Sequence, residues 1–487
     1  MLFLYLALFT LALFVVQLLN SSSRKNQKLP PGPVGIPILG YLPFLDVFHL
    51  GKSFKKVGQK FGDVFSLRVG TELAVVLNSY ESIKKAFAQE ELTSRPNTFM
   101  FRFFSHGEHG IASASGERWK VQSKFAQTQF KKLNKMEEFI QDEVADLATE
   151  LEEKSDNGKK PVEIGFEVNV AIVNVMWALL TGERKPHNDP VLLSLLKAVN
   201  RCIELATTSG ILLFMPFLVR FLPECLFGIS EMRRLMNQTF GYLKDVISDH
   251  KKNFQEDEEP KDFIDAYLKE MKKSDKHSSF TDFQLEVLCS ELFGAGGEPT
   301  SVTLKWAIRY LALNPEVQKK AQKELAKICG ENRKIGLSDR QNLPYFQAMI
   351  MDLIRLSDIH PIGVMHSPSK DTQIEGFHVP KGTFVIPNFH KVHRDSEFWE
   401  KPDHLYPEHW LDQGEFVPKH EGFLSFGTGK RRCPGHDLAL MELFLFLSNL
   451  MQKFTFKLAP GDNGKVESTA GVVVSPKPYL ISLEPRN

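Results

Sequence analysis

The strongest constraint in this sequence is one cysteine, Cys433, in the glycine-rich stretch 426–435 (FGTGKRRCPG), directly before a long helical pattern. The glycines permit backbone conformations that a side chain forbids, so the loop can bring amide N–H groups close to the sulfur. The basic residues 430–432 and the N-terminus of a helix starting near His436 favour an ionised sulfur. Because the thiolate is the form that binds iron, Cys433 is a candidate metal ligand.

For an isolated cysteine, a buried structural role or a helix-capping turn is the simpler interpretation. Here the spacing F-x-x-G-x-R-x-C-x-G is filled at every fixed position, by Phe426, Gly429, Arg431, Cys433 and Gly435. This pattern resembles the haem-thiolate signature of the cytochrome P-450 family. The resemblance implies haem b with Cys433 as the axial thiolate of its iron, a ligand that favours O–O cleavage.

Motif spacing and composition exclude several other classes of protein and limit the rest. A phosphate-binding loop is excluded because Arg431 follows Gly429-Lys430 where Ser or Thr is needed. The formal net charge of +1 gives no electrostatic case for nucleic-acid binding. The five cysteines are odd in number and form no C-x-x-C pair, which indicates a reducing compartment. The 39 phenylalanines suit either a large core or an apolar ligand pocket.

The N-terminal stretch 2–19 (LFLYLALFTLALFVVQLL) carries no charge and as a helix spans ~27 Å. We predict a membrane anchor at 1–20; a cleaved signal peptide is the competitor, but the charged n-region and a small-residue cleavage site are missing. The basic residues Arg24, Lys25 and Lys28 then keep the rest of the chain in the cytosol. A basic, proline-rich hinge at 21–40 and a haem-thiolate catalytic domain at 41–487 follow.

Local patterns predict a mainly α protein with small β-sheets. The predicted segments are a hairpin of 64–69 and 73–77, a helix over 117–132, mostly helix over 141–253, a charged loop at 255–261, a hairpin within 374–387 around Pro380-Lys381-Gly382, and an apolar helix over 437–454. The resemblance implies that they form one large haem-thiolate domain with the cytochrome P-450 fold.

A long apolar helix is predicted over 285–313, with a kink at 294–299 (GAGGEP). The family carries A-G-x-D/E-T-T/S in the helix that crosses the distal haem face, and this chain matches it at Ala295, Gly296, Glu298, Thr300 and Ser301. Pro299 replaces the threonine that helps deliver protons to the oxygen site. The resemblance therefore leaves Glu298 and Thr300 as candidates for the proton relay.

Further family positions concern the haem propionates and the loop around the haem. By resemblance, Arg95, Trp119, His366 and Arg431 hold the propionates; Ser123 stands where the family has an arginine, with Lys124 as the candidate substitute. His366 is alternatively an exposed loop histidine. Asp352 and Arg355 match E-x-x-R, either as a common surface ion pair or as a buried lock with a shortened acid that compromises the bidentate contact. His409 replaces the commonest arginine of P-E-R-F/W.

The resemblance, to the microsomal drug- and steroid-type branch, implies a monooxygenase that inserts one atom of O2 into an apolar substrate. The resemblance also implies electrons from NADPH through NADPH-cytochrome reductase, with cytochrome b5 as a second candidate partner, and a location at the endoplasmic reticulum membrane. A peroxide isomerase or dehydratase that needs no external electrons is the alternative that Pro299 supports, and a non-catalytic haem-binding protein is the third. By resemblance, residues 98–106, the break at Gly294 and residues 359–365 line the substrate pocket.

Overall fold

The computed structural model describes residues 28–132, 136–273, 278–331, 333–469, 471 and 473–486. The predicted anchor at 2–19 lies outside these residues. Among the helices of the described part, none combines the length and the apolar character needed to cross a bilayer.

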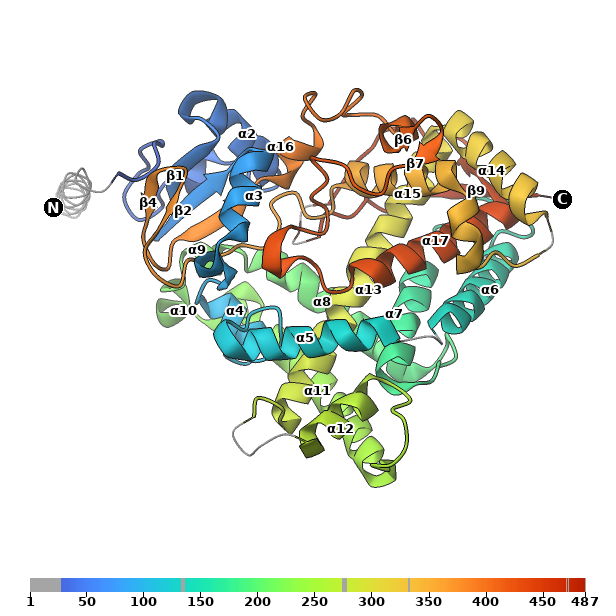
Figure 1. The fold of residues 1–487 in the computed structure, drawn as a ribbon, viewed down its shortest axis with the longest axis horizontal. Coiled ribbons are helices and arrows are strands. Elements are labelled where there is room, and N and C mark those ends of the chain that lie inside the picture. The colour runs from blue at the N-terminus through green and yellow to red at the C-terminus, as the bar shows by residue number, and fades with distance from the viewer. Residues whose placement is uncertain are drawn as a thin grey trace.

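Helices make up most of the fold, and strands are few and short (Figure 1). The α-helices are α2 (Leu50–Phe61), α3 (Tyr80–Ala88), α4 (Phe99–Phe104), α5 (Gly116–Lys132), α6 (Met136–Lys154), α7 (Gly165–Thr181), α8 (Pro190–Thr208), α9 (Ile211–Phe214), α10 (Leu218–Phe221), α11 (Ile229–Asn253), α12 (Phe263–Lys273), α13 (Asp282–Leu313), α14 (Pro315–Cys329), α15 (Pro344–Ser357), α16 (Phe389–His393) and α17 (His436–Lys453). Short 3-10 turns are η2 (Leu42–Phe44), η3 (Glu90–Thr93), η4 (Glu224–Phe227), η5 (Leu337–Asn342), η6 (Pro407–Trp410) and η7 (Gly429–Arg431). The mainly α expectation is confirmed.

The largest sheet joins the N-terminal hairpin to a strand from the C-terminal half. Its strands are β1 (Val64–Val69), β2 (Glu72–Leu77) and β5 (Phe384–Pro387), with β2 antiparallel to β1 and parallel to β5. The other pairs are antiparallel: β3 (Thr372–Ile374) with β4 (Phe377–Val379), β6 (Leu411–Asp412) with β7 (Glu415–Phe416), and β8 (Phe454–Leu458) with β9 (Ile481–Pro485).

The hairpin predicted around Pro380-Lys381-Gly382 is wrong. The turn lies at Glu375-Gly376 instead, where both residues have positive φ (49° and 80°), as a two-residue turn that matches the strand twist requires. Beyond Pro380-Lys381-Gly382 the chain does not pair back onto this hairpin. Val385 of β5 pairs instead with Val75 of β2. The predicted hairpin of 64–77 is confirmed.

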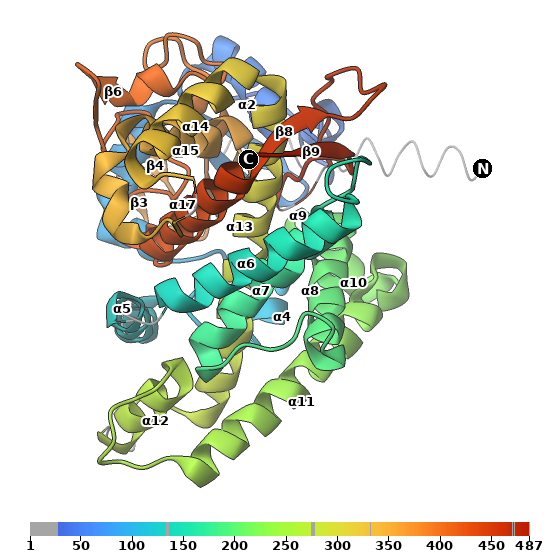
Figure 2. The same ribbon diagram turned by 90° about the vertical axis from the view of Figure 1, so that its right-hand side faces the viewer.

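The main core lies among helices that are apolar on nearly every side. Residues 170–181 of α7 are all buried, and α7 packs against both α6 and α13 (Figure 2). Helix α13 is continuous through Pro299, so the glycines and the proline do not end it. Since buried neighbours cover α13 along most of its length, packing holds the helix together where its own sequence weakens it.

Candidate haem site

The loop that carries Cys433 is closed by its own backbone. The Cys433 N–H donates to the Phe426 carbonyl at 2.9 Å, between η7 and the start of α17. Gly427 and Gly429 have φ of 71° and 70°, which favour glycine. A Cβ on Gly429 would lie 2.1 Å from the carbonyl oxygen of Phe87, so no larger residue fits. The glycines therefore set the course of the loop and the position of the sulfur.

The Cys433 side chain is exposed, yet the surrounding protein raises the pKa of its thiol by desolvation. The Gly435 N–H and the charge of Arg432 act in the opposite direction and do not overcome this effect. The charge of Arg432 therefore acts in the expected direction but does not ionise the free thiol, and Lys430 is paired with Glu90 instead. A bound metal cation would supply the missing stabilisation of a thiolate.

Arg431, two residues before Cys433, points into a ring of backbone carbonyls. Its Nε donates to Thr93 O at 2.6 Å, its Nη1 to Ile111 O at 3.0 Å, and its Nη2 to Ala114 O. The acceptors lie at Thr93, the last residue of η3, and in the stretch between η3 and α5, so one side chain fixes the cysteine loop against this N-terminal segment.

Arg95 lies in the same region and bonds to Ala112 O at 3.1 Å, Val364 O at 3.2 Å and Met365 O at 2.9 Å. Burial lowers the pKa of Arg95 to about 10 and that of Arg431 to about 8, and the Arg95 charge contributes to the second shift. Within the described residues, neither guanidinium forms an ion pair. Two desolvated cations held only by neutral carbonyls fit a ligand that carries carboxylates.

Trp119 of α5 packs beneath Arg431, whose guanidinium carbon lies 3.9 Å from the centre of the Trp119 ring system. The indole is nearly buried, and its N–H bonds to no residue in the described part of the chain. One turn further along α5, Ser123 is buried and accepts a bond from Gln127 Nε2 at 3.4 Å. Lys124, the substitute that sequence reasoning offered, is exposed.

His366 is buried, so its alternative interpretation as an exposed loop histidine is wrong. Its backbone pairs with Val385 of β5, its ring stacks on Phe87 at 3.7 Å, and its Nδ1 lies 2.6 Å from Leu92 O. Burial and the Arg95 charge lower the pKa of His366 well below its ordinary value. The ring is thus neutral with its proton on Nδ1, because only a protonated nitrogen can donate to the carbonyl.

Glu291 of α13 is a member of this site that sequence reasoning missed. Its Oε2 accepts the N–H groups of Ile111 at 2.6 Å and Ala112 at 3.0 Å, in the segment that Arg431 and Arg95 also hold. Burial raises the pKa of Glu291 to about 7 against the effect of these bonds and of Arg431. The only signal in the sequence is an acid one turn before the glycine run, which does not reveal its distant partners.

The two relay candidates on α13 are not brought together. Glu298 and Thr300 are separated by about 200° around the helix. Burial raises the pKa of Glu298, with Lys305 opposing the shift. Thr300 is buried and faces the Glu442 carboxyl of α17. The Pro299 carbonyl accepts the Thr303 hydroxyl at 2.8 Å.

Glu442 is a second buried acid that the sequence did not single out. It is almost entirely buried, and its Oε1 has no hydrogen-bond partner among the described residues. Burial raises the pKa of Glu442 to about 8, and the Thr300 hydroxyl lowers it only in part. At neutral pH this side chain is therefore mostly an uncharged carboxylic acid between α13 and α17.

Asp352 and Arg355 of α15 form a buried lock, and the predicted loss of bidentate geometry is wrong. Arg355 Nε lies 2.7 Å from Asp352 Oδ1, and Nη2 lies 3.1 Å from Oδ2. His409 Nδ1 adds a third contact to Asp352 at 3.0 Å, and the Tyr406 N–H a fourth at 2.7 Å. The other Arg355 bonds go to the carbonyls of His393, Pro402 and His404. Because Asp352 and Arg355 lie one turn apart on α15, the shorter aspartate side chain still reaches the guanidinium with both oxygens.

Comparison with known proteins agrees with this geometry. The sequence model of the family described as Cytochrome P450 matches residues 30–483. The chain is 32% identical to cytochrome P450 2D3 of Rattus norvegicus, over 98% of this chain and 97% of the relative. It is 34% identical to cytochrome P450 2J3 of the same species (97% and 94%) and 33% identical to cytochrome P450 2J2 of Homo sapiens (95% and 92%).

Proposed function

We propose, from the premise that this chain belongs to the cytochrome P450 family, that Cys433 is the thiolate ligand of its haem iron. The family makes the protein a haem-thiolate monooxygenase, an oxidoreductase. Haem, when bound, supplies the activation of O2 with electrons delivered from outside the protein. The observation that carries the assignment to Cys433 is the pair of buried arginines, Arg95 and Arg431, which hydrogen-bond to backbone carbonyls and form no ion pair among the described residues, beside the loop with the signature.

Arg95, Arg431, Trp119 and His366 would hold the haem propionates. The two guanidiniums and the free indole N–H are donors that suit carboxylates. His366 differs, because its Nδ1 proton is committed to Leu92 O and its Nε2 is an acceptor. It can donate to a propionate only after it takes up a proton, which the negative charge of the propionate would favour.

For proton delivery we favour Glu298 over Thr300. On α13, Glu291 and the accessible Ala295 share one face, and Glu291 marks the side that looks toward Arg431. Glu298 lies about 60° around the helix from Ala295, whereas Thr300 lies about 140° away and faces Glu442. Glu298 would therefore move the proton, and Thr300 would hold Glu442 in position.

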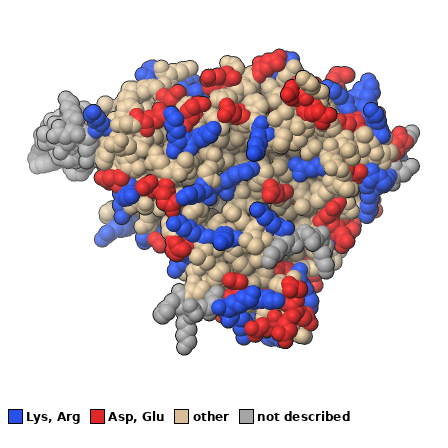
Figure 3. Space-filling model, viewed as in Figure 1, with Lys and Arg blue, Asp and Glu red and all other residues tan. Residues whose placement is uncertain are grey.

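The electron donor would be NADPH-cytochrome reductase, with cytochrome b5 as the second candidate. Lys and Arg side chains are spread over the face on which α5 lies (Figure 3). On this face Lys430 and Lys120 both pair with Glu90, while Arg432 is exposed. Charge reversal of Lys430 and Arg432 together should slow reduction and weaken its salt dependence. Reversal of Lys457, an exposed lysine of β8, is the control; equal rates in both variants would refute this docking face.

Association with the endoplasmic reticulum membrane is supported by exposed apolar side chains. Phe48, near the start of the described chain, is 66% exposed, and Phe221 at the end of α10 is 74% exposed. Removal of residues 1–20 should release part of the protein from membranes while haem binding persists. Loss of haem from a well-expressed truncated protein would instead make that segment part of the fold.

The decisive experiment is spectroscopic. The reduced carbon monoxide complex should show the red-shifted Soret band of thiolate ligation, and Cys433→Ala should abolish it while Cys329→Ala should not. An unchanged spectrum in Cys433→Ala would disprove the assignment. Apolar substrates are then found by screening lipids, terpenoids and steroids for spectral shifts of the haem.

One observation favours a second candidate function. Pro299 removes the usual hydroxyl from α13, which suits a peroxide isomerase or dehydratase that needs no external electrons. Turnover of a lipid hydroperoxide without NADPH or reductase would support this function. A monooxygenase requires both NADPH and the reductase.

A further inference from the structure

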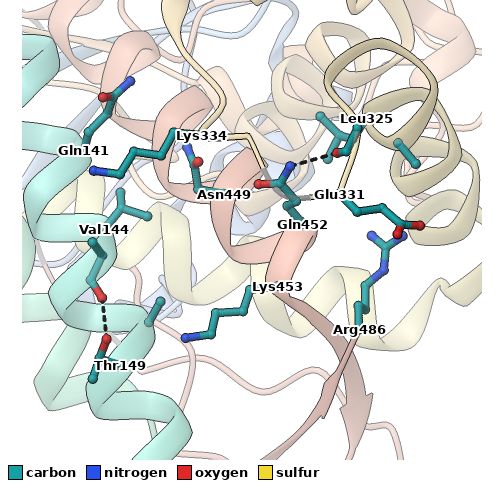
Figure 4. Close-up of a pocket in the computed structure, with 14 residues that line it drawn as sticks. Gln141, Val144, Thr149, Leu325, Glu331, Lys334, Asn449, Gln452, Lys453 and Arg486 are labelled. Carbon is teal, nitrogen blue, oxygen red and sulfur yellow. Dashed lines mark hydrogen bonds between the residues drawn. The ribbon is translucent and has the colours of Figure 1, made fainter.

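A hollow of about 430 Å³ lies between α6, α14 and α17 (Figure 4), in a part of the molecule that the proposed haem chemistry does not use. Its α17 residues, Asn449 to Lys453, lie 13 or more residues beyond His436, which is about 20 Å along the helix from the cysteine loop. The volume is in the range of small-molecule sites. A ligand here would not touch the haem.

The floor of this hollow is carbon. Val144 and Ala148 from α6 meet Leu325 from α14, and all three are buried. The wall is held in place by α17: Asn449 bonds both the N–H and the C=O of Ile335, at 3.1 and 3.2 Å, and Gln452 Nε2 donates to Gly330 O at 2.9 Å. The loop beside the hollow is therefore fixed before any ligand arrives, which lowers the ordering cost of binding.

The rim is positively charged. Lys334, Lys453 and Arg486 line the hollow, and Glu331 is the only acid among its lining residues. Figure 4 shows the Lys334 and Lys453 side chains extending toward α6. Lys453 is neutralised in part by Glu152, at 2.6 Å, whereas exposed Lys334 has no ion pair in the described residues.

The apolar lining and the cationic rim together indicate which class of ligand would bind in this hollow. We propose that this hollow binds an amphiphilic anion: a single alkyl or acyl chain lies on Val144, Ala148 and Leu325, and its carboxylate or phosphate contacts Lys334 and Lys453. A neutral chain would leave the Lys334 ammonium group without a charged partner and Lys453 with Glu152 alone. A bare anion would contact only the cationic rim and would leave the apolar side chains that line the hollow unused.

The test uses the haem-loaded protein, and calorimetry measures binding of decanoate and decyl phosphate below their micelle concentrations. We expect saturable binding with an unshifted haem spectrum, at least tenfold weaker in the double variant Lys334→Gln, Lys453→Gln. Lys457→Gln is the matched control, because Lys457 also pairs with a glutamate, Glu484, on the surface at 2.7 Å. Whichever of decanoate and decyl phosphate binds more tightly shows whether the site prefers a carboxylate or a phosphate headgroup.

Ala148→Phe, which fills the floor, should weaken both ligands, and decyltrimethylammonium should not bind. Equal affinity in the double variant and the control would overturn the proposal. So would binding that always shifts the haem spectrum, or binding of inorganic phosphate as tight as that of decyl phosphate. None of these results depends on turnover, so they are separate from failure of the proposed oxygenase function.

Discussion

The guanidinium carbon of Arg431 lies 3.9 Å from the centre of the Trp119 ring system, which joins the cysteine loop to α5 across about 300 residues of sequence. A guanidinium stacked on an indole gains a cation–π attraction and keeps its planar N–H groups free for other bonds. Arg431 uses these groups to reach three carbonyls in the segment from η3 to α5. The contact explains how the cysteine loop and the segment from η3 to α5 are held as one unit.

Arg431→Lys should weaken haem retention although the charge remains. Lysine cannot reach three carbonyls in one plane, so we expect a loss of about 1.5–3 kcal/mol, or roughly 10- to 100-fold faster haem transfer to an apo-globin acceptor. Arg118→Lys is the control, since Arg118 is an exposed arginine of α5 with one carbonyl contact, to Glu108 O at 3.2 Å. Similar transfer rates in the two variants would contradict this role.

Asp352→Asn should reduce the free energy of unfolding by about 3–5 kcal/mol, because Arg355 loses its buried counter-charge. Glu408→Gln, which breaks the exposed pair with Lys320, should cost less than about 1 kcal/mol. Burial opposes ionisation of Asp352, but His409 and Arg355 overcome it and lower its pKa. Its contribution is therefore present above the unfolded pKa and is lost as the pH falls through the lower folded value. Denaturant titrations at several pH values measure both effects.

Glu442→Gln should change how stability depends on pH. Because burial raises the folded pKa of Glu442 to about 8, its protonated form stabilises the fold fully below pH ~4.5 and this contribution is lost as the pH rises toward 8. The slope is at most about 1.4 kcal/mol per pH unit. Denaturant titrations from pH 5 to 8 should be flatter in Glu442→Gln than in the parent. Glu421→Gln, an exposed acid, should leave the slope unchanged; a parent-like slope in Glu442→Gln would show that this acid is ionised throughout.

Pro299→Thr should raise the fraction of NADPH electrons recovered in product, because it restores a hydroxyl beside Glu298 on α13. We expect a severalfold fall in peroxide released per product formed, measured with purified reductase. Pro299→Ala separates the two effects of the proline, since it removes the ring and adds no hydroxyl. Equal coupling in the Thr and Ala variants, or loss of substrate binding in both, would mean that the ring shapes the pocket.

Local sequence determined the parts of this protein whose cause is local. The glycines around Cys433 predict the turn of its loop, and apolar periodicity predicts helices α5, α13 and α17. Two adjacent apolar runs predict the hairpin of β1 and β2. The structure confirms these elements. The family pattern also indicated Arg95, Trp119 and His366, which the structure brings to one region with Arg431.

Tertiary structure decided whatever depends on partners far away in the sequence. Strand β5 pairs with the edge of β2 and not with the neighbouring β3–β4 hairpin. The local sequence around Pro380-Lys381-Gly382 does not predict this distant partner. Glu291 finds its amide donors 180 residues away, at Ile111. The Cys433 thiol keeps a raised pKa despite basic neighbours, because desolvation depends on how closely the assembled protein surrounds the sulfur. Spacing specifies which residues can act together, and only packing sets their distances and their access to water.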